Sequence, residues 1–274
     1  MGKHRSQKRQ KQSSKAHTKS KQSDPFQKTP SRKPENSELK QPPTIPFSPD
    51  HRILLIGEGD FSFSRALIDH HSCTCLCATS FDSQSSSLSK YPQVAATITT
   101  IAKAENCKVE YNIDATKLGH PGHIGSGSKI LRRGNWDRIV FNFPHVGGLT
   151  KDVNRQVRAN QELVVGFFRA ALPLLAHDGQ IILTIFEGEP YELWSVRDLA
   201  RHVGLKVQRS FRFQAGAYPG YKHARTLGNI EGSGGWKGED RPARTYVFES
   251  HEGQDRAPPS AKRKRDESDS DSDQ

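Results

Sequence analysis

The sequence predicts an α/β fold, a mostly parallel sheet of about seven strands that ends in an antiparallel hairpin and is flanked by disordered tails. Two observations predict it. From residue 51 to about residue 213, segments typical of strands alternate with segments typical of helices, which is the pattern of a parallel sheet with crossover helices. The last two strand-like segments then follow each other without an intervening helix, as in an antiparallel hairpin.

The charge balance favours a polyanionic partner. The 274 residues include 41 Lys and Arg against 30 Asp and Glu, for a net charge of +11. An excess of this size is most often used to bind nucleic acid. No apolar run approaches the roughly 20 residues of a membrane-spanning helix, and the N-terminus is too polar for a signal peptide. We therefore expect no membrane role and reduced cysteines.

No metal site is expected. Cys73, Cys75 and Cys77 alternate along one expected strand, so they should point the same way, but small buried side chains explain them better than metal ligands do. His120 and His123 lie in a loop rich in Gly, His and Ser without nearby thiols. Neither group has the composition of a structural metal centre.

Both ends of the chain have the composition of disordered tails. Residues 1–50 are rich in Lys, Arg, Gln, Ser and Pro and cannot bury enough apolar surface to fold. This basic arm fits a solvated tail or import signal, and equally a non-specific RNA contact. Residues 250–274 combine the basic cluster Lys262–Arg265 with an acidic Ser-rich run, residues 266–273. Together these tails suggest the nucleus, and within it the nucleolus.

The domain, residues 51–249, begins with its most informative stretch. Ile53–Ile56 is an apolar run that predicts a short strand buried on both faces, and residues 61–71 read as a helix. Between them, Gly57 and Gly59 form a tight turn of the kind that lets a ligand approach the backbone closely. A plain strand–turn–helix without a ligand is the alternative.

The residues of this turn restrict the ligand. Ser62 stands where a dinucleotide-binding turn places its third glycine, which disfavours a pyrophosphate. Glu58 and Asp60 are poor neighbours for phosphate and suit a cationic or neutral polar group, such as the amino-acid end of S-adenosylmethionine. With Phe61 at the start of the helix, they complete the expected cofactor-binding turn.

Two further acidic residues end the next strands. A second strand, residues 73–81, ends at Asp82, where a carboxylate can bind a ribose or cap the next helix. Around Tyr91-Pro92 one short helix is expected to end and another to begin. A third strand, residues 108–113, ends at Asp114, which can meet an adenine or simply shape the turn before Ala115.

The fourth strand, residues 137–141, leads into a second informative stretch. Asn142, Phe143, Pro144 and His145 follow it and precede Gly147-Gly148. The carboxyl ends of parallel strands form the active sites of open α/β sheets, so an amide, a ring and an imidazole are expected there. Asn-Pro-Pro-aromatic tetrapeptides hold the target nitrogen of amino-methyltransferases in this way. A strand simply terminated by Pro is the alternative.

The second half of the domain completes the sheet. A helix is expected over residues 154–176, a fifth strand over 180–186 after an Asp178-Gly179 turn, and another helix over 192–203 with Gly204 as its C-cap. The sixth and seventh strands are expected over residues 205–213 and 244–249. Nicotinamide-binding folds do not usually end on such a hairpin.

The long connection between the last two strands is the expected RNA-facing surface. Tyr218, Tyr221, Lys222, His223 and Arg225 crowd one short loop. Aromatic rings stack on unpaired bases and cations hold phosphates. The alternative is a Pro-Gly turn whose tyrosines pack on the sheet. The Gly-rich residues 230–241 should be mobile.

These stretches together resemble the eukaryotic large-subunit rRNA uridine-N3 methyltransferase family, in the family's order from about residue 51 to residue 249. The matching segments are Gly57–Ser64, Asp114–Leu118, Asn142–His145, Arg158-x-Asn160-Gln161 and Tyr218–Thr226. The resemblance implies a Rossmann-like Class I methyltransferase sheet, S-adenosylmethionine as cofactor, and large-subunit rRNA or a pre-ribosome as partner. The sequence does not fix the oligomeric state, and a monomer is the favoured expectation.

The resemblance also implies roles for individual residues. Asn142, Pro144 and His145 are the expected catalytic residues, with His145 either the proton acceptor or a stacking partner. Gly57, Glu58, Gly59, Asp60, Phe61, Asp82, Asp114 and Asn142 are the expected cofactor-binding residues. A non-catalytic RNA-binding assembly factor with the same fold is the main alternative. A nicotinamide-dependent enzyme is disfavoured by the absent third glycine.

Overall fold

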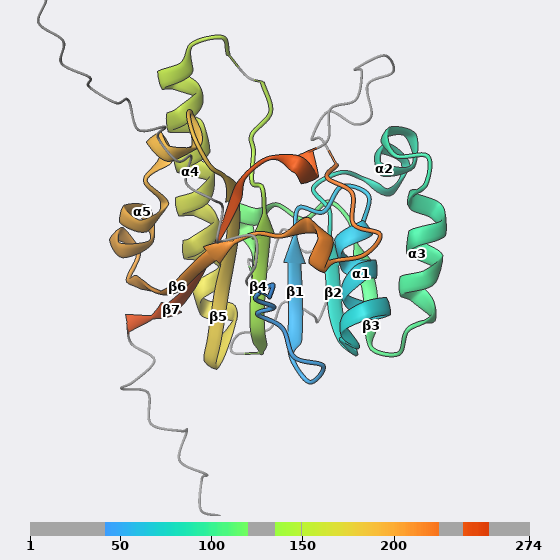
Figure 1. The fold of residues 1–274 in the computed structure, drawn as a ribbon. Helices are drawn as coiled ribbons and strands as arrows, with labels where there is room; N and C mark the ends of the chain where they lie inside the picture. Colours follow the sequence, from blue (N-terminus) through green and yellow to red (C-terminus); the bar gives the residue numbers. More distant parts are fainter. Residues whose placement is uncertain (1–41, 120–134, 149, 225–237, 252–274) are drawn as a thin grey trace, which may run out of the picture. The chain divides into compact units, whose positions relative to one another are not determined.

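The computed structural model describes residues 42–119, 135–148, 150–224 and 238–251 (Figure 1). Most of the two predicted tails, together with His120, His123 and Arg225, lies outside these residues. The packed part of the domain starts earlier than the expected boundary at residue 51. Ile45 and Phe47 already pack against the core, and the carbonyl of Pro46 accepts a hydrogen bond from Arg138 Nε at 3.2 Å.

The described residues form a sheet of seven strands in the order β3-β2-β1-β4-β5-β7-β6. β1 to β5 pair in parallel, and β7 is antiparallel to both β5 and β6, which confirms the predicted fold. The strands are β1 (Arg52–Ile56), β2 (Cys75–Thr79), β3 (Cys107–Glu110), β4 (Trp136–Asn142), β5 (Leu175–Phe186), β6 (Leu205–Arg212) and β7 (Ala243–Ser250).

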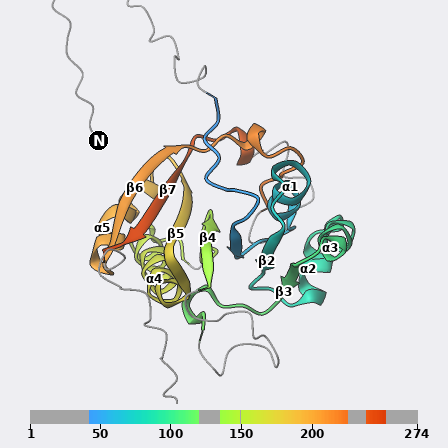
Figure 2. The same ribbon diagram turned by 90° about the horizontal axis from the view of Figure 1, so that it is seen from below.

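Helices cover both faces of the sheet (Figures 1 and 2). α4 and α5 pack on the face that carries Leu54 and Ile56 of β1. α1 and α3 pack on the face that carries Ile53 and Leu55. β1 is therefore buried on both faces, because alternate side chains of a strand point to opposite faces. The helices are α1 (Ser62–His71), α2 (Gln84–Lys90), α3 (Val94–Lys103), α4 (Val153–Ala171) and α5 (Val196–His202).

The expected helix over residues 154–176 and the strand after it divide differently. α4 ends at Ala171, and a 3₁₀ turn (Leu172–Leu174) with Pro at its second position follows. Pro cannot donate to the helical ladder, so the helix stops there. β5 begins at Leu175, five residues earlier than expected, because it pairs with Trp136 before the register shifts.

The expected helix over residues 192–203 is also divided. A 3₁₀ turn η4 (Tyr191–Trp194) precedes α5, and Ser195 between them has a φ of 50°. Helical hydrogen bonding is interrupted at such a left-handed residue.

The cysteines correct another expectation. Cys73 lies before β2 and packs on the α1 side, whereas Cys77 packs on the α4 side. All four cysteines are free thiols. Within the described residues, no group of three or more His, Cys, Asp or Glu side chains is placed to hold a metal ion. No helix in that part of the chain is long and apolar enough to cross a membrane.

The centre of the α4 face should dominate stability. Phe167 is fully buried, and its ring lies 5.1 Å from that of Phe141 and 5.6 Å from that of Phe168. Phe167→Ala should lower the free energy of unfolding by about 3–5 kcal/mol, because it removes buried apolar surface and leaves a cavity. Phe81→Ala is the matched control, since Phe81 is 71% exposed. Equal effects of the two changes on urea unfolding would contradict this core.

Candidate active site

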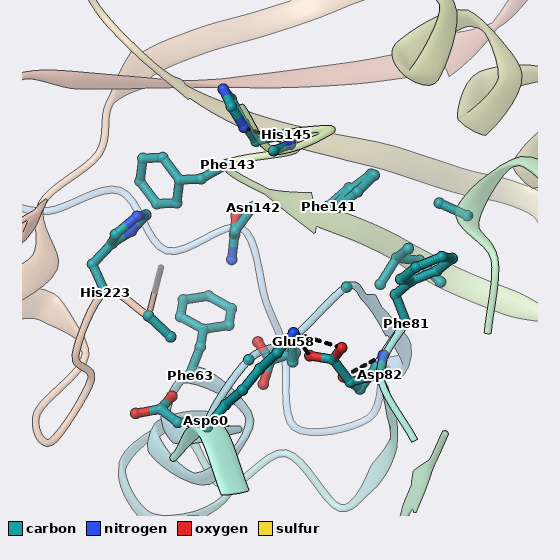
Figure 3. Close-up of a pocket in the computed structure, with 18 of the residues that line it drawn as sticks. Glu58, Asp60, Phe63, Phe81, Asp82, Phe141, Asn142, Phe143, His145 and His223 are labelled. Atoms are coloured by element: carbon teal, nitrogen blue, oxygen red, sulfur yellow. Dashed lines mark hydrogen bonds and ion pairs between the residues drawn. The ribbon is translucent and has the colours of Figure 1, made fainter. Parts of the chain in front are cut away.

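The main candidate pocket lies at the carboxyl ends of β1, β2 and β4 and has a volume of about 670 Å³. Its walls come from segments far apart in the sequence (Figure 3). The main ones are the turn after β1, the end of β2, the loop after β4 and residues 221–224, and Lys90, Tyr91 and residues 113–115 after β3 also contribute. The two stretches that the sequence singled out, residues 57–60 and 142–145, therefore face the same hollow.

The two glycines of the first turn are required for different reasons. Gly57 has a φ of +68°, and a Cβ atom there would lie 2.7 Å from Cε2 of Phe141. Gly59 has ordinary backbone angles, but its Cβ atom would lie 2.7 Å from the Cβ of Ala224. The first glycine thus permits the turn itself. The second lets the segment before β7 lie directly against the turn.

The carboxylates of this turn hold the start of α1. Glu58 accepts hydrogen bonds from the amide and the hydroxyl of Ser64. Asp60 accepts from the Ser62 amide at 3.0 Å and from Nε2 of Gln93 at 3.2 Å. Both acidic residues line the pocket. They therefore have a structural role even without a ligand.

Phe61 is not part of the pocket wall. It is fully buried, and its ring packs edge-on against Tyr111 at 5.9 Å. Its φ of 58° places it in the left-handed region at the N-cap of α1, so its side chain turns into the core beneath the turn. The Phe61 ring therefore does not meet a ligand in the pocket, and contact of its backbone amide with a cofactor stays a prediction.

Asp82 and Asp114 lie on the pocket wall as expected. Both oxygens of Asp82 accept from Lys90 Nζ, at 2.7 and 2.9 Å. The N-cap of α2 is Ser83 and not Asp82, so capping does not explain Asp82.

Asp114 does shape its turn. It accepts from the amide of Thr116 at 2.9 Å and from its hydroxyl at 2.7 Å. Burial alone would raise the pKa of Asp114, but these hydrogen bonds and the charge of Lys117 outweigh it and lower that pKa. Asp114 is therefore an anion fixed in the wall, and contact with an adenine stays a prediction.

Phe81 is a pocket residue that the sequence reasoning missed. It lies between β2 and Asp82, lines the pocket, and leaves 71% of its surface exposed. Most large apolar side chains of the described residues are buried. An exposed ring beside a pocket offers a flat apolar surface to a planar ligand. Its position next to the acidic end of the strand was the signal that could have identified it.

The Asn-Phe-Pro-His stretch continues directly from β4. Asn142 is the last residue of β4, and its side chain points into the pocket (Figure 3). Phe143 has a φ of 52°, a strained conformation for a residue with a side chain. The Phe143 amide donates to the carbonyl of Thr184 at 2.7 Å, and its ring packs 4.6 Å from Phe186. These contacts hold the Phe143 ring away from the Asn142 side chain. Pro144 is buried behind them.

His145 is fixed in one tautomer. Its Nδ1 accepts a hydrogen bond from the Gly147 amide at 2.9 Å, so the neutral ring carries its proton on Nε2. Burial lowers the pKa of His145, which favours that neutral form. The ring therefore presents an N–H donor and not a basic lone pair at Nε2. Of the two roles expected for His145, this geometry disfavours the proton acceptor.

α4 holds the loop that carries His145. Asn160 is 1% exposed, and its Oδ1 accepts from the amide of Val146 at 3.0 Å. Nε2 of Gln156 donates to the carbonyl of Gly147. Gln161 in turn donates to the carbonyl of Leu193 at 3.1 Å. Asn160 of the sequence motif therefore supports the pocket loop, whereas Gln161 holds the η4 turn against α4.

The loop expected to face RNA is largely packed inward. Tyr218 is 4% exposed and stacks on Phe213, with 5.6 Å between ring centroids and 12° between ring planes. Its ring also lies 4.7 Å from Phe63. The prediction that Tyr218 stacks on RNA bases is therefore wrong. The alternative, tyrosines packed on the sheet, is the one that the structure supports for Tyr218.

The rest of this loop forms a wall of the pocket. Tyr221 Oη lies 3.2 Å from Nδ1 of His223, and burial raises the pKa of Tyr221 well above its usual value. The backbone of Lys222 accepts from and donates to the same Ser62 hydroxyl, at 3.1 and 3.0 Å. The His223 ring packs edge-on at 4.6 Å from Phe143. These three residues thus join the glycine turn after β1 to the loop after β4.

The pocket should make stability depend on pH through Glu58. Burial raises the pKa of this carboxyl from 4.5 to about 7, so the folded protein keeps a proton that the unfolded chain has lost. The free energy of unfolding should therefore fall between pH 4.5 and about 7, by up to about 3 kcal/mol, and level off above.

Glu58→Gln removes this titration while keeping a hydrogen-bond acceptor for Ser64. Urea unfolding of both proteins from pH 5 to pH 8 checks it. The wild-type protein should lose stability relative to the variant as the pH rises. A difference that stays constant over this range would contradict the assignment.

Comparison with known proteins places the chain in a family. Residues 54–225 match the BMT5-like family model, described as rRNA (uridine-N3-)-methyltransferase BTM5-like. The 25S rRNA (uridine(2634)-N(3))-methyltransferase of Saccharomyces cerevisiae is 33% identical over 270 residues, covering 82% of this chain and 80% of that protein. An uncharacterized protein of Arabidopsis thaliana is 34% identical over 210 residues, covering 74% of this chain and 94% of that protein.

Among solved structures, the chain is similar to the fibrillarin pre-rRNA processing protein of Methanococcus jannaschii. The two are 14% identical with a TM-score of 0.44, and the match covers 78% of this chain and 72% of that one. This TM-score is too low to support an argument. The family model and the yeast relative, each matching well over half of this chain, show that the chain belongs to the BMT5-like rRNA (uridine-N3)-methyltransferase family.

Proposed function

We propose that this protein transfers a methyl group from S-adenosylmethionine to N3 of a uridine in large-subunit rRNA. The observation that carries the proposal is the meeting of two segments at one pocket. The glycine turn after β1 and Asn142 at the end of β4 open on the same hollow, in a chain of the uridine-N3 methyltransferase family.

The residues of the pocket fit this cofactor. Gly57 and Gly59 leave the backbone of the turn without side chains. Asp82 presents a carboxylate suited to ribose hydroxyls, and the exposed ring of Phe81 beside it offers a surface for an adenine. Glu58 and Asp60 give the turn the acidic character that a cationic amino group favours. When bound, S-adenosylmethionine supplies an electrophilic methyl group.

The loop after β4 suits the target base. Uridine N3 carries an imide proton in the plane of the ring. This proton must pass to solvent water before or as N3 is methylated, and the base must be held edge-on for N3 to react. The side-chain oxygen of Asn142 and the backbone carbonyl of Phe143 are acceptors for that N–H; Pro144 is buried and is not among the residues that line the pocket. Strain at Phe143 and the packed ring fix this geometry before substrate arrives, and catalysis is then mostly positioning.

His145 has a role that follows from its tautomer. As N3 loses its proton, negative charge spreads over the two carbonyl oxygens beside it. A neutral imidazole with its proton on Nε2 can donate to one of these oxygens and stabilise that charge. We therefore assign His145 as a hydrogen-bond donor to the uracil edge, not as the base.

The substrate must expose the base. N3 is buried in a Watson–Crick pair, so the target uridine has to be unpaired or flipped out. An immature large-subunit rRNA or pre-ribosome meets this requirement more readily than a finished subunit. The basic cluster Lys262–Arg265, outside the described residues, supports a nuclear and nucleolar location for this work.

Methyl transfer from labelled S-adenosylmethionine to unmodified large-subunit rRNA tests the proposal directly. The label should appear in 3-methyluridine. Asn142→Ala should reduce kcat about 100-fold or more because the base edge loses its positioning. Label in another nucleoside would remove uridine as the target. No label, with cofactor binding and a pre-ribosomal substrate confirmed, would favour a non-catalytic assembly factor.

Two substitutions distinguish the roles of His145. His145→Ala should lower kcat by about 100-fold, the usual effect of removing a donor to developing oxyanion charge. His145→Gln retains an N–H donor and should recover a substantial part of that loss. If His145 were the base, Gln would be as inactive as Ala, and the acidic limb of the pH–kcat profile would disappear in both. Cofactor affinity, measured by calorimetry, should be unchanged in either variant.

A further inference from the structure

Two smaller hollows continue from the candidate active site. A pocket of about 120 Å³ shares His145 with the main pocket, and a groove of about 440 Å³ shares Tyr191 with that smaller pocket. The groove extends between the ends of β5 and β7 and the first turn of α5. The three hollows thus adjoin one another at His145 and Tyr191.

Aromatic rings pack along this path, but Phe186 is 5% and Trp194 1% exposed, so the partly exposed rings of Tyr191 and Tyr246 are the ones that can meet a ligand. Phe143 packs 4.6 Å from Phe186, and Phe186 packs 5.4 Å from Tyr191. Tyr191 in turn lies 5.2 Å from Trp194. Tyr246 lines the far groove. The packed rings therefore run from Phe143, beside the proposed target-base site, to Trp194 in the η4 turn.

Arginines lie over these rings. The guanidinium carbon of Arg241 is 4.2 Å from the ring centre of Phe186 and 5.5 Å from that of Tyr191. Arg197 lies 5.5 Å from the ring centre of Tyr246. A guanidinium on an aromatic face is held in place while its N–H groups remain directed outward.

The acidic residues of the groove are mostly neutralised. Glu187 pairs with Arg244 at 2.7 Å, and Asp198 pairs with Arg201 at 2.8 Å. Glu192 accepts a hydrogen bond from the Gly188 amide at 3.1 Å and keeps its charge. Arg197, Arg241 and the exposed Lys151 of the smaller pocket leave the path cationic.

We propose that this path, from His145 through Tyr191 to Arg197, binds the single-stranded nucleotides that flank the target uridine. The inference rests on the proposed function for the nature of the substrate. Partly exposed tyrosine rings beside arginines suit unpaired bases and their phosphates. A duplex does not expose base faces and fits this row poorly. The path also takes over the role that the sequence assigned to Tyr218, whose ring is buried.

Charge-neutral variants of the two arginines test the path. Arg197→Gln, Arg241→Gln and the double variant are compared with Arg169→Gln, a matched control in the last turn of α4, at the opposite end of the sheet. The readouts are KM and kcat for unmodified large-subunit rRNA. A second readout is the salt dependence of binding to a fluorescein-labelled oligouridylate. Arg241→Lys, which keeps the charge, reports any loss of folding caused by the shape change alone.

In the double variant, KM should rise several-fold while kcat and cofactor affinity stay unchanged. The slope of log affinity against log salt should fall by about 1.4, since each phosphate contact of a single strand contributes about 0.7. The Arg169 control should match the wild type in both readouts. A double variant with wild-type KM and wild-type slope would overturn the path and leave the proposed methyl transfer untouched.

If the wild-type protein methylates no RNA, the proposed function fails, and the binding measurement still decides the path. A lower salt slope in the double variant alone would then support a single-strand surface on a non-catalytic protein. An unchanged slope would reject the path as well.

Discussion

The site depends on the contact between the glycine turn and residues 221–224 of the connection between β6 and β7. Gly59 lies so close to Ala224 that a side chain at position 59 would push the two segments apart. The Ser62 hydroxyl both donates a hydrogen bond to the backbone of Lys222 and accepts one from it. These contacts connect residues about 160 positions apart and carry the β6–β7 connection across the carboxyl end of the sheet. Without them the pocket would lose the wall that Tyr221 and His223 supply, and Phe143 would lose one of the rings that hold it.

The sequence predicted the elements that depend on local pattern. The strand order along the chain, the terminal hairpin and the facing of Gly57 and Asn142 on one pocket all follow from apolar periodicity and from the rule that carboxyl ends of parallel strands meet at one edge. The same reasoning failed where packing between distant segments decides. Phe61 and Tyr218 are aromatic residues of the kind that bind ligands, yet both side chains are buried. Phe61 has a left-handed backbone conformation that turns its ring into the core. Tyr218 lies in the connection after β6 and packs on Phe63.

Roles of individual side chains were harder to predict than positions. The tautomer of His145 is set by one amide, that of Gly147, and that loop is fixed in turn by Asn160 of α4. No pattern in the sequence predicts this hydrogen bond, although His145 and Asn160 both belong to the motifs that the sequence singled out. Phe81 was missed for the opposite reason, since an apolar residue at the end of a strand is normally a core residue. Only its 71% exposure distinguishes it.

Charge divides the carboxyl edge of the sheet into two regions. Glu58, Asp60, Asp82 and Asp114 gather on the side of the pocket formed by β1, β2 and β3, whereas Arg197 and Arg241 lie beyond β5, over the rings. Lys90 and Lys117 pair with Asp82 and Asp114, and the pKa of Glu58, raised to about 7, leaves it partly protonated near neutral pH. The first region is therefore only weakly acidic, whereas the second is cationic and attracts a polyanion. Its backbone should therefore run along the arginines, and only an uncharged base should reach across to Asn142. Under the proposed function, the arginines thus orient the strand, and the acidic residues of the turn disfavour a phosphate beside the base.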